Sequence, residues 1–511
     1  MKLEIMKRKN NKFLLMPFQN IVVLINLIIL GNLLSLNAQE TTNYTLNEVV
    51  KIAQNQSPDA LKAKHRFRVS YWNFKIFRAD YLPNLRLDAT IPNLNRTISA
   101  VQGQDGTSIY TPASLTNYSV DLSLSQKIGF TGGSVFLSTG VRRMDNFLAD
   151  TTTTGYLTNM VSIGINQPLF AYNPYKWRKH IEPMKYEEAR RTYVETNEEV
   201  ASTAINYFFT LLLAQVELDI SRKNESNYDT LFRIAQGRYN LGKIAENELL
   251  QLELNLLKAQ SSFENSQLSY ENAIFVFKSY LRIKNNQAIA LIPPTKTDYF
   301  IVPAQTAIEQ AKDNTSMGIA FQRRILEAES QINQAKMDGR FDADIFAMFG
   351  LTQTSDNLPD AYKNPLDEER VTIGLTVPIL DWGKARGKIK LAESNMDLVQ
   401  TAVDQDKIDF EQNIFIEAMQ FNMQEKQLLI AAKSDTVAQK RYNVTQKRYM
   451  IGKVNDILEL TNAQIDNDNS KMGYYRALRT YWVSYYQIRK LTLYDFERKM
   501  PIIIDVDALL E

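Results

Sequence analysis

The sequence has few residues that could carry metal or thiol chemistry. It contains no cysteine and two histidines among 511 residues, which leaves few ligands for zinc, iron–sulfur or thiol sites. His65 and His180 stand alone, and we interpret both as structural. No nucleophile–base set, phosphate-binding loop or pair of catalytic carboxylates stands out. The formal net charge of +2 gives no overall bias toward nucleic acid. We therefore expect no enzyme activity, cofactor, metal or nucleic-acid partner.

Long apolar runs are also missing, apart from one near the N-terminus. IVVLINLIIL at 21–30 follows a lysine-rich start and precedes SLNAQ, in which Ala38 fits the last residue before a cleavage site. We interpret residues 1–38 as a secretory signal peptide; the alternative, a membrane anchor, needs a longer apolar run. The lack of cysteine excludes a lipid-anchored lipoprotein. Any membrane insertion of the mature chain must therefore use β-strands.

The sequence contains two copies of one unit, offset by 210 residues. RYNLGK at 238–243 recurs as RYMIGK at 448–453, and VSIGINQP at 161–168 recurs as VTIGLTVP at 371–378. An offset that is kept across so long a stretch indicates a duplication rather than chance similarity. We expect a first repeat at 39–298, a second at 299–498 and a C-terminal tail at 499–511.

Each copy is expected to begin with one helix, at 45–80 and at 303–339, and to continue with alternating strands. In the first return strand, Val161, Ile163 and Ile165 share one face, and small polar residues share the other. This pattern fits a strand between lipid and water, and equally a half-buried strand of a soluble sheet.

Copy one has a longer segment between its first strand and its return strand. The extra residues, 93–158, contain two further alternating runs at 119–126 and 134–141. They predict an added β-hairpin, and the alternative is a long surface loop.

Proline is absent from residues 379–500, and glycine is rare there. The composition predicts a helix over 384–450 and a matching one over 174–240, with a kink at Pro183. Each would be about 100 Å long. Such helices need lateral partners, because propensity alone leaves a helix marginal. Between 249 and 280, apolar residues step by three and four, the pattern of left-handed coiled-coil packing.

The two long helices are expected to end at matching glycines. Gly242 and Gly452 can adopt the positive φ that ends a helix and reverses the chain. Both breaks then lie at one tip of the molecule, and the strands lie at the opposite end.

An exported chain with two such units resembles the TolC family of outer-membrane efflux proteins. The most specific residues are VPILDWGKARGKIKLAES at 377–394, where a strand passes into a helix, and the Tyr-x-x-Gly breaks at 239–242 and 449–452. The copy-one junction, QPLFAYNPYKWRKHIE at 167–182, departs from the pattern because Ala171 and Tyr172 replace the acidic residue and glycine. The likeness spans residues 40–498.

The resemblance implies a mostly α chain with a membrane β-barrel portion. Duplicated units of long coiled-coil helices and β-hairpins would form an α-barrel and β-barrel tunnel in a homotrimer. The protein would be an exit duct in the cell outer membrane, with its helices in the periplasm, for a tripartite efflux or type I secretion system. Its partners would be outer-membrane lipid, a periplasmic membrane-fusion adaptor and an inner-membrane pump of the RND or ABC type. The strand number supports a shared barrel: the strands of one chain are too few to close a barrel, and open strand edges are not tolerated in lipid, so several chains must share one.

The resemblance also implies roles for residues near the breaks. The window after the second break holds Asp456 and Glu459, three residues apart on one helix face, as candidates for the entrance. Six such carboxylates in a trimer would attract cations and repel one another. The copy-one candidates are Glu246 and Glu248, and for all four the alternative is a solvated surface charge.

Further candidates follow from position. The residues expected to lock the tip are Arg238, Arg448, Tyr239 and Tyr449. The two arginines would bridge to acidic residues on neighbouring helices; ordinary surface ion pairing within a helix is the alternative. The residues expected to form the helix turns and contact an adaptor are Gly242, Lys243, Gly452 and Lys453. The residues expected at the strand-to-helix junctions are Pro168, Pro378, Asp381 and Gly383.

A second hypothesis is an exported structural or adhesive surface protein built from a helical coiled coil. It predicts no pore. The duplicated strand pairs argue against it, because a coiled-coil stalk has no use for amphipathic strands at matched positions.

Overall fold

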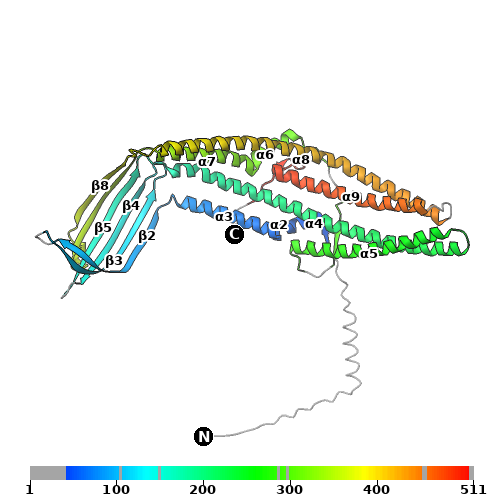
Figure 1. Cartoon of the computed structure of the whole chain (residues 1–511), viewed down its shortest axis with the longest axis horizontal. Helices are drawn as coiled ribbons and strands as arrows, with labels where there is room; N and C mark the ends of the chain where they lie inside the picture. The colour runs from blue at the N-terminus through cyan, green and yellow to red at the C-terminus, as the bar shows by residue number, and fades with distance from the viewer. Residues whose placement is uncertain are drawn as a thin grey trace, which may run out of the picture.

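The protein is elongated, with a β-sheet at one end and paired helices reaching to the other (Figure 1). The computed structural model describes residues 42–102, 106–147, 151–284, 288–294, 299–451 and 457–505. The signal peptide predicted at 1–38 lies outside these residues. Among the helices that are described, none is both long enough and apolar enough to cross a bilayer.

The elements of the first half follow the expected order. They are β1 (Thr42–Thr45), α2 (Leu46–Gln56), α3 (Pro58–Ala79), β2 (Asn84–Gln102), β3 (Ser108–Lys127), β4 (Ser134–Phe147), β5 (Thr152–Pro168), α4 (Pro174–Asn240) and α5 (Glu246–Leu281).

The second half repeats this order with two strands fewer in the sheet. Its elements are β6 (Ile289–Ile292), α6 (Ala304–Asn314), α7 (Ser316–Asp338), β7 (Asp342–Ser355), a short 3₁₀ turn (Asp360–Tyr362), β8 (Leu366–Thr376), α8 (Lys384–Met450), α9 (Ile457–Thr492), β9 (Tyr494–Asp495) and β10 (Met500–Pro501). The two long helices α4 and α8 both have 67 residues, and α5 and α9 both have 36.

Six strands form one antiparallel sheet in the order β2-β3-β4-β5-β7-β8. Strands β3 and β4 fall within residues 93–158, so the hairpin predicted there is present and the loop alternative is wrong. In the described part of the chain, β2 and β8 each pair on one side only. The sheet therefore has two free edges.

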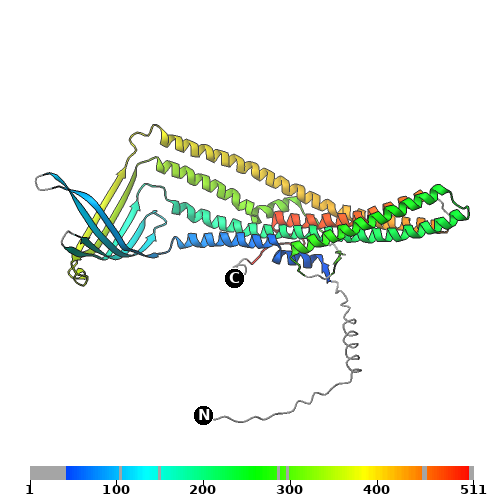
Figure 2. The same ribbon diagram turned by 60° about the horizontal axis from the view of Figure 1, so that its bottom comes forward.

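Four helices continue the sheet as a single layer in matching order. Figure 2 shows α3, α4, α7 and α8 side by side, running to the right from the strands, and each packs on the next. Nearer the tip the order is α5, α4, α9, α8, because α4 contacts both α5 and α9, and α9 contacts α8. The wall is one helix thick, and its edges are α3 and α5 on one side and α8 on the other.

Each N-terminal helix predicted as continuous is in fact two helices. At 45–80 the break falls at Ser57, whose side chain caps α3 at Ala60, with Pro58 in the first turn. At 303–339 it falls at Thr315, and the partly buried Glu195 of α4 accepts from the Ser316 N–H and hydroxyl (2.7 and 2.8 Å). A carboxylate from another helix thus replaces the missing local cap.

The largest apolar core lies where α2, α4, α5, α6, α8 and α9 meet. Phe208 and Phe209 of α4, Phe277 of α5 and Phe421 of α8 are all buried in it. The coiled-coil pattern predicted at 249–280 is confirmed, because its apolar residues, such as Leu252 and Phe277, pack in the interior while α5 lies against α4. Helix α4 continues through Pro183.

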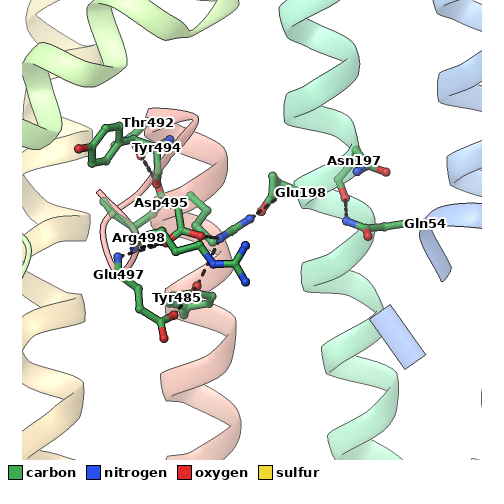
Figure 3. A network of polar contacts seen from close by, with 11 residues as sticks. Gln54, Asn197, Glu198, Tyr485, Thr492, Tyr494, Asp495, Glu497 and Arg498 are labelled. Atoms are coloured by element: carbon green, nitrogen blue, oxygen red, sulfur yellow. Dashed lines mark hydrogen bonds and ion pairs between the residues drawn. The ribbon is translucent and has the colours of Figure 1, made fainter. Parts of the chain in front are cut away.

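A buried ion-pair network closes this core (Figure 3). Arg489 of α9 donates to both oxygens of Glu198 on α4 (2.8 and 3.3 Å) and to Asp495 in β9 (2.6 Å). Asp495 also accepts from the backbone N–H groups of Glu497 and Arg498. The network ties α4, α9 and the turn after α9 together.

Candidate functional site

One face of the sheet is apolar and open to its surroundings. A row of directly paired residues crosses five strands and consists of Leu85, Leu124, Leu137, Ile163 and Phe349. Each of these side chains is between 37% and 64% exposed. The sequence alone also allowed a half-buried sheet of a soluble protein, but in such a sheet other residues of the chain would cover this apolar row. An uncovered apolar band of this width marks a lipid or protein contact.

The opposite face is lined with small and polar residues. The adjoining row, again in direct register, consists of Arg86, Ser123, Ser138, Ser162, Gly350 and Glu368. One bulky contact interrupts this face: the Phe136 and Phe346 rings stack with centroids 5.9 Å apart, over the space left by Gly164. The alternation predicted from sequence therefore separates an apolar face of the sheet from a polar, water-compatible face.

Aromatic side chains flank the apolar band at both ends. At the end far from the helices, the Arg143 guanidinium lies over the rings of Tyr118 and Tyr156. At the helical end, Phe170 and Phe341 pack with centroids 4.6 Å apart. Rings at both boundaries of an apolar band are the arrangement of membrane-spanning strands.

The second strand-to-helix junction is built around Asp381. After Pro378, its carboxylate accepts from the backbone N–H groups of Gly383 (2.9 Å) and Ala385 (2.8 Å) at the start of α8. These bonds hold the pKa of the Asp381 carboxyl below its usual value. Gly383 adopts φ +84°, which explains the glycine at this position.

The first junction reaches the same end with another residue. Pro168 ends β5, and the Asn173 side chain accepts from the N–H groups of Tyr175 and Lys176 (3.0 and 3.2 Å) to cap α4. Asn173 thus takes the capping role that the acidic residue, missing at 171, has at the second junction. Asparagine before a proline at the first helical position was the available signal.

At the tip, the first break is resolved in detail. Gly242 has φ +67°, as predicted, and this left-handed conformation lets the chain turn back after α4. Leu241 before it is 75% exposed, and Ile451 at the end of α8 is 66% exposed. Lys243 follows in the same turn. Gly452, Lys453 and Asp456 lie outside the described residues.

Arg238 joins the two helical hairpins. Its guanidinium donates to the carbonyl oxygens of Tyr449 (3.3 Å) and Met450 (3.2 Å) at the end of α8. It also lies over the Tyr449 ring, 5.3 Å from the centroid. Tyr449 is buried, which raises the pKa of its hydroxyl, whereas its copy-one counterpart Tyr239 is exposed. The partner of Arg238 is thus a helix C-terminus and a ring, not the carboxylate expected from sequence.

The remaining tip candidates lie on the returning helices. Glu459 in the first turn of α9 pairs with Arg448 (3.7 Å). Glu246 and Glu248 both lie in the first turn of α5, where carboxylates favour the helix N-terminus. The structure therefore brings acidic residues from both repeats to the tip.

The sequence matches the model of one protein family over residues 132–274 and 344–492, together more than half of the chain. That model describes outer membrane efflux proteins. This chain belongs to the outer membrane efflux protein family. It is accordingly an outer-membrane efflux channel and a passive conduit, with its helical part in the periplasm. Channels of this family work as homotrimers that dock with adaptors and pumps.

Solved structures of such channels share this efflux channel's fold. The Campylobacter jejuni CmeC outer membrane channel superposes with a TM-score of 0.63 at 17% identity, covering 91% of this chain and 88% of that one. VceC of Vibrio cholerae gives 0.59 at 11% identity, covering 88% and 95%. The open state of MtrE from Neisseria gonorrhoeae gives 0.51 at 13% identity, covering 88% of each chain. A search of curated protein sequences finds no match to this chain.

Proposed function

We propose that three copies of this efflux channel close into one tunnel through the free edges of both layers. The observation that carries this proposal is that each edge exposes apolar residues that nothing in its own chain covers. In the sheet, the edges are β2 and β8, and joining them around a threefold axis yields eighteen strands from six per chain. Closure removes open strand edges, which lipid does not tolerate.

The helical edges support the same closure. On α3, Val69, Trp72 and Ile76 are each 61% exposed and face away from α4. On α8, exposed apolar residues recur every seven positions toward the tip: Ile416, Met423, Ile430, Val437, Val444 and Ile451. Seven-residue spacing keeps one face of a helix toward a partner along a coiled coil.

The opposite edge, α5, carries a complementary stripe. Leu250, Leu254, Leu257, Leu268 and Phe275 are all exposed, on the side of α5 turned from α4. Leu257 lies about three turns from the tip on α5, and Val437 lies about three and a half turns from the tip on α8. The heights match, so α8 of one copy would lie against α5 of the next.

Disulfide trapping tests this closure directly. The native chain has no cysteine, so Leu257→Cys with Val437→Cys introduces the only thiols. Oxidation in the membrane should give covalently linked trimers. The control, Leu257→Cys with Leu391→Cys, puts the second thiol at the far end of α8 and should stay unlinked. Equal linkage in both pairs, or none in either, would contradict the proposed edge.

We further propose that the helical tip is the gated entrance. Glu459 and Asp456, with Glu246 and Glu248, would supply the negative charge that selects cations. Arg238 and Tyr449 would hold the two hairpins together in the closed state, Arg448 would hold α9 against α8 through Glu459, and Tyr239 lies next to Arg238 in the chain. Both Arg238 contacts join copy one to copy two, so breaking them frees the hairpins to separate.

The exposed turns are the proposed adaptor contact. Leu241 and Ile451 are apolar and exposed at the tip, and Gly242 and Lys243 follow Leu241 in the first turn. Gly452 and Lys453, which the sequence predicts in the second turn, belong to the proposed contact as well. A periplasmic membrane-fusion adaptor would dock there and connect the duct to an inner-membrane pump of the RND or ABC type. The MtrE channel, which has this fold, crystallised in an open state, and an opening tip in the present channel would be consistent with such a state.

Single-channel conductance in planar bilayers tests the gate. Arg238→Gln with Arg448→Gln should increase conductance or open probability, because the Arg238 contacts between the hairpins and the Arg448–Glu459 pair within the second hairpin are both lost. Glu459→Gln should lower the preference for cations. Arg233→Gln, which removes an exposed cation paired with Asp229 on the same helix, is the control and should change neither. Unchanged conductance in the double variant would refute Arg238 and Arg448 as the lock.

A further inference from the structure

A cationic pocket lies where the sheet meets the helices. Its volume is about 990 Å³, and it is enclosed by the end of α3, the turn between β3 and β4, and the start of α4. Five basic side chains line it: Lys75, Arg78, Lys176, Lys179 and His180. No acidic residue is among the lining residues.

The positive charge of this pocket is not neutralised by neighbours. Within the described ranges, Arg78, Lys176 and Lys179 form no ion pair, and Lys75 lies over the Tyr71 ring. Asp80, just after α3, is already paired with Arg178 (3.2 Å) and with Lys127 of β3 (3.9 Å). Clustered cations without counter-charges repel one another unless an anion binds between them.

The rest of the pocket is mostly apolar, and two of its residues are strongly exposed. Phe130 at the β3–β4 turn is 85% exposed, and Leu82 just before β2 is 63% exposed. Phe77 and Tyr81 complete the wall and pack on each other with ring centroids 5.2 Å apart. A ligand for this pocket would therefore combine an anionic group with apolar chains.

The hand of the chain places the pocket on the apolar side of the wall. Ile128 follows β3 with the same parity as Leu124, and its N–H donates toward β4, to Gly133 (2.7 Å). On a descending strand of L-residues, the N–H of a residue whose side chain faces the viewer points left. Viewed from the apolar face with the helices below, β4 therefore lies left of β3, and α4 lies left of α3.

Helical geometry then fixes which residues face the viewer. The two helices touch along the line of Phe67 and Tyr186. In this view α3 is on the right and runs upward, and α4 is on the left and runs downward. In either helix, residues rotated roughly 80° to 120° around the helix axis from that contact line, in the direction of the chain, face the apolar side. Lys75 of α3 and both Lys176 and His180 of α4 occupy those angles. The pocket thus opens outward, directly beneath the apolar band.

We infer that this pocket binds the phosphate headgroup of an anionic phospholipid from the inner leaflet of the outer membrane. The inference rests on the proposed orientation, in which the apolar face meets lipid and the helices enter the periplasm. Headgroups of the inner leaflet then lie at the level of the basic residues, and acyl chains can follow Leu82 and Phe130 onto the apolar band. Basic clusters at such a boundary attract anionic lipids, and exposed aromatic residues lie at the same level.

The test compares lipid retention by the purified trimer in nanodiscs and by native mass spectrometry. The probes are phosphatidylglycerol, phosphatidylcholine and inorganic phosphate. The wild-type channel should retain phosphatidylglycerol in preference to phosphatidylcholine. Arg78→Gln with Lys176→Gln and Lys179→Gln should reduce that preference at least about tenfold, since each cation near an anionic surface contributes. Inorganic phosphate should not displace the lipid at equal concentration.

The matched control removes three cations elsewhere. Lys433→Gln with Lys440→Gln and Lys447→Gln makes the same charge change on the distal half of α8 and should retain the preference. An equal loss in both variants, or no preference in the wild type, overturns the inference. Displacement by inorganic phosphate assigns the site to free phosphate instead of lipid and also overturns it. Conductance recorded in parallel separates this outcome from failure of the proposed tunnel, because a conducting trimer without lipid preference refutes the lipid site alone.

Discussion

Replacing Glu198 with alanine should destabilise the helical core far more than replacing its neighbour Glu199. The Glu198 side chain is 4% exposed and accepts two hydrogen bonds from Arg489, which is itself only 15% exposed. Burial alone would lower the pKa of the Arg489 guanidinium, but the hydrogen bonds and charge of Glu198 outweigh it and raise that pKa. Glu199 instead pairs with Lys490 at the surface and is 49% exposed.

The expected magnitude follows from what each change leaves behind. Glu198→Ala deletes two charge-assisted hydrogen bonds and leaves a buried guanidinium with Asp495 as its remaining acid. Breaking a buried pair on one side costs about 3–5 kcal/mol, and the surviving Asp495 contact puts the value near the lower end, about 3 kcal/mol. Glu198→Gln keeps one acceptor and should cost about half as much. Glu199→Ala removes a surface pair and should cost less than about 1 kcal/mol.

Denaturant unfolding of the detergent-solubilised protein, followed by circular dichroism, measures these differences through the midpoint and its slope. If refolding is incomplete, the thermal midpoints rank the variants in the same order. Equal losses for Glu198→Ala and Glu199→Ala would refute the reasoning, because burial would then have no part in the effect. A loss below about 1 kcal/mol for Glu198→Ala would do the same.

Two other predictions concern the sheet and helix α9. Gly164→Ala should destabilise the sheet by about 1–3 kcal/mol, because a Cβ there meets the Phe136 ring, whereas Gly155→Ala meets open space and should be neutral in thermal unfolding. Burial raises the pKa of the Asp468 carboxyl even though Asn224 donates to it (2.7 Å). The folded state therefore binds a proton at Asp468 more tightly than the unfolded state does. The ionised carboxylate lowers the free energy of unfolding at neutral pH, and this destabilisation disappears as the pH falls through the raised pKa toward 3.8. Asp468→Asn should raise the free energy of unfolding at pH 7. The variant should also gain less stability than the wild type between pH 7 and pH 4, and an unchanged pH profile of stability would refute this.

Local sequence signals were sufficient to predict the long helices and the strands. The bounds predicted for the rods, 174–240 and 384–450, are those of α4 and α8, because proline and glycine are scarce inside them and a glycine follows each. Strict alternation likewise predicted the β3–β4 hairpin. Both signals depend on residues close together in the chain.

The errors arise where distant residues decide the structure. The break at Thr315 has no proline to announce it, and it depends on Glu195 from a helix more than a hundred residues away. Ser57 with Pro58 was a readable signal that the apolar periodicity on both sides concealed. At the tip, Arg238 was expected beside an acid, but it meets the carbonyl oxygens of α8, a contact that only the packing of the two hairpins creates.

The added hairpin has a consequence for the width of the duct. Strands spaced about 4.8 Å apart and tilted by about 40° give the six-stranded sheet of one chain a width of roughly 38 Å. Four helices packed side by side at about 9–10 Å span nearly the same distance. The two layers of each chain therefore subtend the same arc of the tunnel. Cargo leaving the helical part of the closed trimer would meet no taper where helices give way to strands.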